Sequence, residues 1–418
     1  MRLGARLQRR AVGAAVLAGV LVAAMPAAGV AVPSAGPAAT ASGTSSATEA
    51  AEWTTQKVRI GDSASTQAMS FDGGLARTHI GATAYVHVGL MRWSDSGVYY
   101  TRSTDHGATW RKAFRLNGVD QQGRGIRLAS AGSNLYAAWM RDTSSGTMVY
   151  FRRNRDHGNY AGWLDRVRLT SAAGLGYPSI AAARTSVYVA YGNHTSGTVS
   201  LRISRDRGAT WRRITLGSAS PVDGGGNWHF INPLVTASGA NIAVFWPATP
   251  GGDVIGRVST DSGVHWSTEK NLGTSLTSAH ALDARIAVAG DDAAGNAWVR
   301  VWRAGTWGSK RVVVPAGDTG GAAGTRWSPA VALRGTAQVG VAYQQSADGI
   351  ATRTLWSQSN DRGATWLAAE TLPQPYPWRD AGDVPSVAWR SNGRAFVLVD
   401  DRSDPQEEGF YVSLSTRP

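Results

Sequence analysis

A short motif, Ser/Thr-x-Asp-x-Gly-x-x-Trp, recurs along this chain at intervals of about fifty residues. Four full copies contain Asp105, Asp206, Asp261 and Asp361, and a looser copy containing Asp156 reaches its Trp two residues late. The successive Asp positions are 51, 50, 55 and 100 residues apart, so the last interval spans two periods and one unit has lost the motif. A repeat of this length indicates an array of supersecondary units, because each unit buries its apolar face only against its neighbours.

A second marker, a proline that opens an apolar strand, keeps a nearly constant phase with the first. It occurs at Pro178, Pro233, Pro329 and Pro385. The first two lie 28 residues before the Asp of the next motif, and Pro329 lies 32 residues before Asp361. Two unlike markers that stay in phase indicate one repeated structural unit.

Each unit contains four short segments that we interpret as β-strands. In residues 178–217 these segments are 179–182, 187–191, 198–204 and 211–216, and the motif forms the turn before the last of them. No stretch of the sequence shows sustained helical periodicity. Four short antiparallel strands in a unit of this length are typical of one blade, so we predict an all-β fold, a β-propeller.

The two ends of the chain favour a closed ring. Residues 412–418 resemble the strand before Asp261, and residues 53–61 resemble the strand after each motif, with Trp53 in the place of the motif Trp. We therefore predict that residues 53–60 supply the outer strand of the last blade, which removes exposed sheet edges. The predicted blades are seven: 66–117, 124–170, 176–217, 227–273, 280–314, 326–372, and 380–418 with 53–62. Six blades remain the alternative, because the fifth unit is short and lacks the motif.

The segment before the repeats has a different composition. Residues 1–31 combine four arginines, an apolar run and small residues, which predicts a signal peptide rather than a membrane anchor, and Arg9-Arg10 leave twin-arginine export open. Residues 32–51 predict a disordered linker, and residues 52–418 predict a single propeller domain. We therefore expect a secreted monomer whose mature form has no membrane segment.

Composition limits the chemistry that the chain can perform. It has no cysteine, which excludes disulfides, thiolate catalysis and Cys-based metal sites. Its formal net charge of +13 either draws it to anionic extracellular partners or only keeps it soluble, and both interpretations stay open. The sequence has no basic-aromatic stripe and no metal-binding or phosphate-binding motif, so we expect no nucleic-acid partner, metal or cofactor.

The Asp, Gly and Trp of each motif are predicted to be structural. The carboxylate can accept hydrogen bonds from the N–H groups of its own turn, the Gly permits positive φ, and the Trp packs the turn against the sheet. A ring of acids or calcium ligands is the alternative, but residues repeated once per blade cannot converge on one site. The residues with this predicted structural role are Asp105, Gly107, Trp110, Asp156, Gly158, Asp206, Gly208, Trp211, Asp261, Gly263, Trp266, Asp361, Gly363 and Trp366.

These turns resemble the Asp-boxes, or BNR repeats, of sialidases and related secreted glycan-active propellers. The resemblance spans nearly all of residues 52–418, and it implies that the Asp-boxes lie on the face opposite the active site. Sialidases of this kind hold the substrate carboxylate with three arginines, the first of them in a Phe-Arg-Ile-Pro motif. This chain has Val58-Arg59-Ile60-Gly61 instead, in a predicted outer strand. The resemblance therefore implies the fold and a glycan, and it leaves the sialidase catalytic residues unassigned.

The loops on the opposite face combine acids, arginines and tryptophans, which suits a sugar site. Among them are Arg92, Asp95 and Arg124. Asp142 and Asp401 are the candidate acid/base pair. The candidate substrate-binding residues are Arg141, Arg326, Arg402 and Trp327. The alternative is that these loops are ordinary surface with ordinary salt bridges.

Two functions remain open. The chain is either a glycosidase that acts on an extracellular, acidic glycan, or a non-catalytic propeller that binds a glycan or a protein. The first predicts a deep pocket in which two carboxylates and several arginines converge. The second predicts a shallow aromatic face without such a pair.

Overall fold

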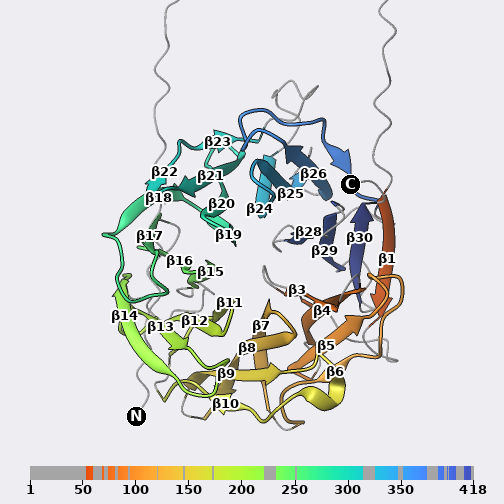
Figure 1. Ribbon diagram of the computed structural model, residues 1–418, viewed down its shortest axis with the longest axis vertical. Helices are drawn as coiled ribbons and strands as arrows, with labels where there is room; N and C mark the ends of the chain where they lie inside the picture. Colours follow the sequence, from red (N-terminus) through yellow and green to blue (C-terminus); the bar gives the residue numbers. More distant parts are fainter. Residues whose placement is uncertain are drawn as a thin grey trace, which may run out of the picture. The chain divides into compact units, whose positions relative to one another are not determined.

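The repeated units fold into small antiparallel sheets that lie in a ring (Figure 1). A computed structural model gives this structure and describes residues 53–59, 68–69, 74–80, 83–92, 95–119, 121–144, 146–171, 174–220, 232–249, 252–313, 325–346, 352–373, 385–389, 393, 395–401 and 409–415. Every described residue belongs to one compact unit of the chain, within residues 50–418. The predicted signal peptide and linker lie outside the described residues. Within the ranges above, no helix is long and apolar enough to cross a membrane.

The first four blades follow one another along the chain. Blade 1 consists of β2 (Ala68–Met69), β3 (Leu75–Ile80), β4 (Thr83–Arg92), β5 (Gly97–Ser103) and β6 (Phe114–Arg115). Blade 2 consists of β7 (Gly123–Ala131), β8 (Asn134–Thr143), β9 (Gly146–Asn154) and β10 (Val167–Arg168). Blade 3 consists of β11 (Ser179–Ala183), β12 (Ser186–Gly192), β13 (Thr198–Ser204) and β14 (Arg212–Ser218). Blade 4 consists of β15 (Leu234–Ser238), β16 (Asn241–Pro247), β17 (Asp253–Ser259) and β18 (Lys270–Thr274).

The last three blades include the unit that lacks the motif. Blade 5 is that unit, with β19 (Leu276–Leu282), β20 (Arg285–Asp291), β21 (Ala297–Arg303), β22 (Thr306–Trp307) and β23 (Arg311–Val312). Blade 6 consists of β24 (Thr325–Arg334), β25 (Gln338–Ser346), β26 (Thr352–Ser359) and β27 (Glu370–Thr371). Blade 7 consists of β28 (Ser386–Trp389), β29 (Ala395–Asp401), β30 (Gly409–Ser415) and β1 (Trp53–Arg59). The all-β propeller is confirmed, and the described strands pair into seven sheets.

Strand β1 closes the ring as the outer strand of blade 7. It pairs antiparallel with β30, from Trp53 opposite Ser415 to Arg59 opposite Gly409. The Trp53 ring is buried and meets Trp356 of blade 6 edge-on, with 5.9 Å between the ring centroids. The predicted closure by the N-terminal strand is therefore confirmed.

Apolar side chains hold the ring together at the junctions between blades. The described residues form seven apolar clusters, one at each junction between neighbouring blades. In β12, Val187 and Val189 face blade 2, whereas Tyr188 and Ala190 face blade 4. Because alternate residues of a strand point to opposite sides of its sheet, each blade supplies one apolar face to each neighbour. No blade buries its core alone, which is why ring closure matters for stability.

The motif forms the turn between the third and fourth strands of a blade. In blade 3, Asp206 Oδ1 accepts hydrogen bonds from Ser204 Oγ at 2.7 Å and from the Thr210 N–H at 2.9 Å. Arg207 and Gly208 both have positive φ, 59° and 82°, so the turn passes through the left-handed region twice. In blade 2 the one-turn 3-10 helix η1 (Tyr160–Gly162) takes up the extra residues of the looser copy.

Arginines link these turns from blade to blade. Each guanidinium donates to a backbone carbonyl oxygen in the turn of the next blade. The pairs are Arg102 with His157, Arg153 with Arg207, and Arg205 with Ser262, at 2.9, 2.9 and 2.7 Å. These contacts join blades 1 to 4 in sequence along one side of the ring.

Candidate functional site

The ring has two chemically different faces. We name the side with the motif turns the turn face. The opposite side, the loop face, carries the hairpins between second and third strands and the connections between blades. This division follows from strand order, because successive antiparallel strands end alternately on the two faces.

The structure places the predicted site residues at the loop-face ends of their strands. Arg141 and Asp142 lie near the end of β8 in blade 2, Asp401 ends β29 in blade 7, and Arg326 and Trp327 lie near the start of β24 in blade 6. Asp142 and Asp401 are therefore on one face, in the two blades that flank blade 1, and their pairing stays a prediction. For Asp401, Arg326 and Trp327 the structure describes the strand but not the side chain, so their predicted roles stay predictions. Arg402 lies outside the described residues.

Asp142 is held by an arginine of the neighbouring inner strand. Arg124 Nε lies 3.0 Å from Asp142 Oδ2, and the two side chains keep 21% and 26% of their surface exposed. Arg141 turns instead to Tyr150, donating from Nη1 to the hydroxyl at 3.1 Å with its guanidinium carbon 5.4 Å from the ring centroid. The structure therefore gives these two adjacent residues different partners, and it assigns Asp142 an ion-pair partner that the sequence did not reveal.

A break in strand pairing sets the position of this arginine. The register of β7 against β8 shifts between Arg124 and Arg127, and Gly125 inside the irregularity has a φ of +59°. A Cβ at Gly125 would collide with the ring of Tyr177, which packs directly on this backbone. Burial raises the pKa of the Tyr177 hydroxyl, and the nearby Arg124 opposes this effect. Glycine is therefore required at position 125 for two reasons: the backbone has a positive φ, and Tyr177 occupies the space that a Cβ would need.

A second cluster surrounds Asp95 in the blade 1 hairpin. Its Oδ2 accepts from the Tyr99 hydroxyl at 2.6 Å and from Arg115 Nη1 at 3.0 Å, and Arg92 Nη2 also contacts it. Burial alone would raise the pKa of Asp95, but hydrogen bonds from Arg92 and Tyr99 and the charges of Arg92 and Arg115 lower it to about 2. Asp95 is therefore ionised at any physiological pH, and two guanidinium groups share its single charge.

The two clusters adjoin on the loop face. The Gly123 N–H donates to Ser96 O at 2.7 Å, and the Asp142 N–H donates to Gln122 O at 3.2 Å. These two hydrogen bonds connect the Asp95 hairpin with the strands that carry Arg124 and Asp142. We name the combined surface the arginine patch; it comprises Arg92, Asp95, Arg115, Arg124, Arg141 and Asp142.

Sequence reasoning missed three residues of this region: Tyr99, Arg115 and Tyr177. Arg115 lies in the outer strand of blade 1, and it reaches the hairpin because it pairs with Tyr99 across β5 and β6. Only the correct strand register, not spacing along the chain, could have identified it.

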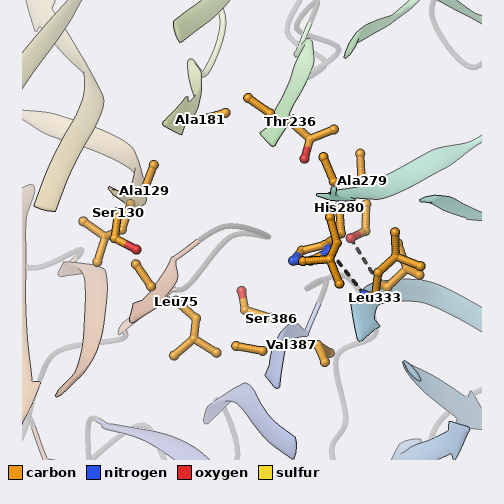
Figure 2. A pocket seen from close by; sticks show the side chains of 18 of the residues that line it. Leu75, Ala129, Ser130, Ala181, Thr236, Ala279, His280, Leu333, Ser386 and Val387 are labelled. Carbon is orange, nitrogen blue, oxygen red and sulfur yellow. Dashed lines mark hydrogen bonds between the residues drawn. The ribbon is translucent and has the colours of Figure 1, made fainter. Parts of the chain in front are cut away.

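A cavity of about 780 Å³ lies inside the ring and is lined by the inner strands. Figure 2 shows side chains from several blades around it, mostly small and apolar. The side chains labelled there include Ala129, Ala181, Thr236, Ala279, His280 and Val387. Neither Asp nor Glu occurs among the described residues of this wall.

One of the residues that line this cavity is His280. Its Nδ1 accepts a hydrogen bond from the Leu333 N–H at 3.2 Å, so the neutral ring carries its proton on Nε2. Burial, reinforced by the charge of Arg285, lowers the pKa of His280 to about 4. His280 therefore offers the cavity one neutral N–H donor.

Among the described residues, no group of three or more His, Cys, Asp or Glu side chains is placed to hold a metal ion. The expected absence of a metal and of a cofactor stays a prediction.

Comparison with known proteins gives the fold. No protein-family model matches the chain, and no curated protein matches its sequence. The phage phi92 endosialidase superposes with a TM-score of 0.50 at 9% identity, over 87% of this chain and 69% of that one. The polysaccharide lyase Uly1 gives 0.49 at 9% identity over 88% and 99%, and the fucose-specific lectin from Aleuria aurantia gives 0.46 at 10% identity over 76% and 100%. At these identities the likeness to the endosialidase shows a shared propeller architecture and no more.

Proposed function

We propose that this chain is a secreted propeller that binds an anionic extracellular glycan on the arginine patch of its loop face. The observation that carries the proposal is a partly exposed surface with four arginines against two aspartates, built from two neighbouring blades. A planar guanidinium group binds a carboxylate or sulfate through paired hydrogen bonds. The resemblance of the turns to those of glycan-active propellers, and the glycan-acting and glycan-binding proteins among the solved structures of similar fold, agree with this assignment.

The state of the described carboxylates favours binding over hydrolysis. Glycoside hydrolysis needs a carboxyl group that stays protonated near neutral pH and can donate to the leaving oxygen. Asp95, with its pKa lowered to about 2, cannot fill that role, and Asp142 is ion-paired with Arg124 at 3.0 Å. Both carboxylates are placed to orient arginines.

Hydrolysis by Asp142 and Asp401 is the second candidate. It is favoured by the position of both residues at the loop-face end of the second strand, in the blades on either side of blade 1. In that case the two carboxyl groups would act as acid and base on a glycosidic bond, which requires them to lie roughly 5–10 Å apart.

One substitution separates the two candidates. Asp142→Asn removes a negative charge from the patch, so a binding surface for anions should keep or increase its affinity, whereas a glycosidase should lose turnover. Titration calorimetry with short uronic and sialylated oligosaccharides measures binding, and release of reducing ends measures turnover. Neutral arabinan oligosaccharides serve as the uncharged control ligand.

Two arginine variants test the location. We expect Arg115→Ala to weaken binding of an anionic oligosaccharide by about tenfold, because a charged hydrogen bond contributes roughly 1.5–3 kcal/mol. Arg303→Ala removes an exposed arginine of blade 5 and controls for the loss of one positive charge. Equal effects of the two variants, or no binding of any anionic oligosaccharide by the wild type, would refute the proposal. Turnover by the wild type that Asp142→Asn abolishes would replace it with the hydrolytic candidate.

A further inference from the structure

The outer strands of three consecutive blades gather exposed cations that look scattered in the sequence. They lie in β6, β10 and β14 and in the segments that precede these strands, on the outside of the ring in Figure 1. We name this surface the basic rim. Its exposed residues are Arg111, Lys112, Arg155, Arg166, Arg168, Arg205, Arg207, Arg212 and Arg213.

The acids in the same segments offset only part of this charge, because four of them, Asp105, Asp156, Asp165 and Asp206, stand against nine exposed cations. Asp206 is engaged by its own turn, where Thr210 Oγ1 donates to Oδ2 at 2.6 Å. Asp105 accepts from Thr109 N at 2.8 Å in the same way, and Asp156 accepts from Asn159 Nδ2 at 2.9 Å. Their positions are fixed by the turns, whereas most of the cations extend into solvent. The rim therefore carries an excess of positive charge over three blades.

Blades 4 and 6 of the same ring lack this excess. The outer half of blade 4, residues 253–274, has two cations against three acids. They are Arg257, Lys270, Asp253, Asp261 and Glu269. The outer half of blade 6, residues 352–373, has two of each. Blade 5 is basic as well, with four cations and no acid in residues 297–313, but blade 4 separates it from the arc of blades 1 to 3. The charge is therefore unevenly distributed around the ring, which a high net charge alone does not require.

Direct contacts make the arc continuous. Arg152 of blade 2 donates from Nη1 to Leu116 O of blade 1 at 3.0 Å, and the Tyr160 hydroxyl contacts Lys112 O. Arg153 of blade 2 reaches the turn of blade 3, as described above. The cations of neighbouring outer strands are thus fixed relative to one another, so a partner longer than one blade meets a preformed surface.

We infer that the basic rim is a second binding surface, and that it holds a long, flexible anionic polysaccharide by charge. It lies on the outer strands and the turns before them, and it borders the arginine patch at β6, which carries Arg115. Its cations are not those of the patch, so it does not depend on the function proposed for that patch. A flexible chain can follow the curve of three blades and contact cations on each of them. Binding of this kind releases counterions, so its affinity falls steeply as salt concentration rises.

Nucleic acid is the other polyanion to consider, and the rim suits it less. Duplex DNA has a persistence length of about 50 nm and resists bending around a single small ring. Single strands are usually held on exposed aromatic rings as well as by charge. The motif tryptophans of these blades are engaged elsewhere: Trp110 Nε1 donates to Gly107 O at 3.1 Å, and Trp211 packs edge-on against Phe151 at 4.9 Å.

The test compares two triple variants with the same loss of charge. Arg155→Gln, Arg168→Gln and Arg213→Gln remove three exposed charges from the rim. Arg303→Gln, Arg311→Gln and Arg362→Gln remove three exposed charges from blades 5 and 6. The ligands are polygalacturonate as the anionic polysaccharide and single-stranded DNA of equal charge, each titrated at several salt concentrations.

We expect the rim variant to lose at least tenfold in affinity for polygalacturonate near 0.1 M salt. The slope of log affinity against log salt should become shallower by roughly two to three, about one for each lost contact. The control variant should change affinity by less than twofold. Thermal unfolding of both variants checks that they remain folded, and binding of a short uronic oligosaccharide to the arginine patch should be the same in both.

Three results would overturn the inference. One is an equal loss of affinity in both triple variants, which would make the effect one of net charge only. Another is tighter binding of single-stranded DNA than of the polysaccharide. The third is loss of polymer binding in Arg115→Ala with no loss in the rim variant, because that would place the polymer on the arginine patch.

Discussion

The turn face and the loop face of this propeller are made by the same strands, yet they fix their aspartates in opposite ways. On the turn face, Asp206 takes its partners from within the motif, between Ser204 and Thr210. On the loop face, one partner of Asp95 is Arg115, which is twenty residues away in β6. The turn-face contacts are local and recur with each motif, whereas each loop-face cluster occurs once.

This difference separates stability from recognition. A turn that satisfies its own polar groups can be copied into every blade, and its carboxylate has little capacity left for a ligand. A cluster assembled from several strands can present an excess of one charge to solvent, as Arg92 and Arg115 do around Asp95. Changes to the Asp, Gly and Thr of the motif turns should therefore alter folding alone, and changes to the arginine patch should alter the binding of a short anionic glycan.

Lowering the pH should have the largest effect. It should reduce the free energy of unfolding and leave the charge of the Asp95 cluster on the loop face unchanged. His87 lies buried between Thr78 Oγ1 and the Tyr100 hydroxyl, each at 2.8 Å, and Tyr100 donates to Gly158 O in the turn of blade 2 at 2.9 Å. Burial, with the charges of Arg102 and His157, lowers the pKa of His87 to about 3. The unfolded chain takes up a proton below its ordinary pKa of about 6.5, and the folded chain does not. The contribution of His87 to the free energy of unfolding should therefore be fully present above pH 6.5 and should be lost as the pH drops towards 3.

The loss through His87 should be about 3 kcal/mol between pH 7 and pH 4, at roughly 1.4 kcal/mol per pH unit. Urea unfolding at the two pH values measures it, and His87→Gln, which cannot titrate, should show a smaller dependence on pH. Because Asp95 stays ionised down to a pKa of about 2, the charge of its cluster should not change over this interval. An unchanged pH dependence in His87→Gln would contradict the assignment.

A single methyl group tests the turn face at constant pH. Gly208 has a φ of +82°, and a Cβ there would lie 2.5 Å from Phe151 Cζ. We expect Gly208→Ala to destabilise the protein by about 2–4 kcal/mol, through backbone strain and overpacking together. Gly239 has a φ of +60° with nothing within 4 Å of the added methyl, so Gly239→Ala should cost only about 1 kcal/mol. Both should bind glycan like the wild type once folded, and weaker binding by folded Gly208→Ala would break the comparison.

The same division, between local repeated contacts and contacts from distant strands, decides how much of the structure the sequence predicted. The motif, the phase of the prolines and the Trp53 strand predicted the propeller and its closure because they are local or repeated patterns. The blade without the motif was still found by its period. These features depend on residues whose partners lie within one blade or at an equivalent place in the next.

The loop face was only partly predictable for the opposite reason. Arg92, Asp95, Arg141 and Asp142 could be located near the right hairpins, but their partners depend on register and on a bulge. The shift between Arg124 and Arg127 in β7 has no clear signal in the sequence. The basic rim escaped notice because no single blade supplies a run of cations.

The glycine at this bulge tests the loop face. Gly125→Ala should displace Tyr177 and the neighbouring Arg124, because the added methyl would occupy the space of the tyrosine ring. We expect affinity for a short anionic oligosaccharide to fall about tenfold, or about 1.4 kcal/mol, in addition to a loss of stability. Calorimetry below the melting temperature separates the two effects, and Gly208→Ala is the matched control. Full affinity in folded Gly125→Ala would show that the arginine patch does not need this geometry.

The smallest effect should come from one hydroxyl of the turn face. Thr210 Oγ1 donates to Asp206 Oδ2 at 2.6 Å, while the Thr210 N–H holds Oδ1 of the same carboxylate at 2.9 Å. Thr210→Val removes the first contact and leaves the second, and Thr210 is exposed, so water can replace the lost partner. We expect a loss of about 0.5 kcal/mol in stability and no change in binding. A change in affinity for a short anionic oligosaccharide from this variant would mean that the motif turn, despite its self-contained hydrogen bonds, takes part in recognition at the arginine patch.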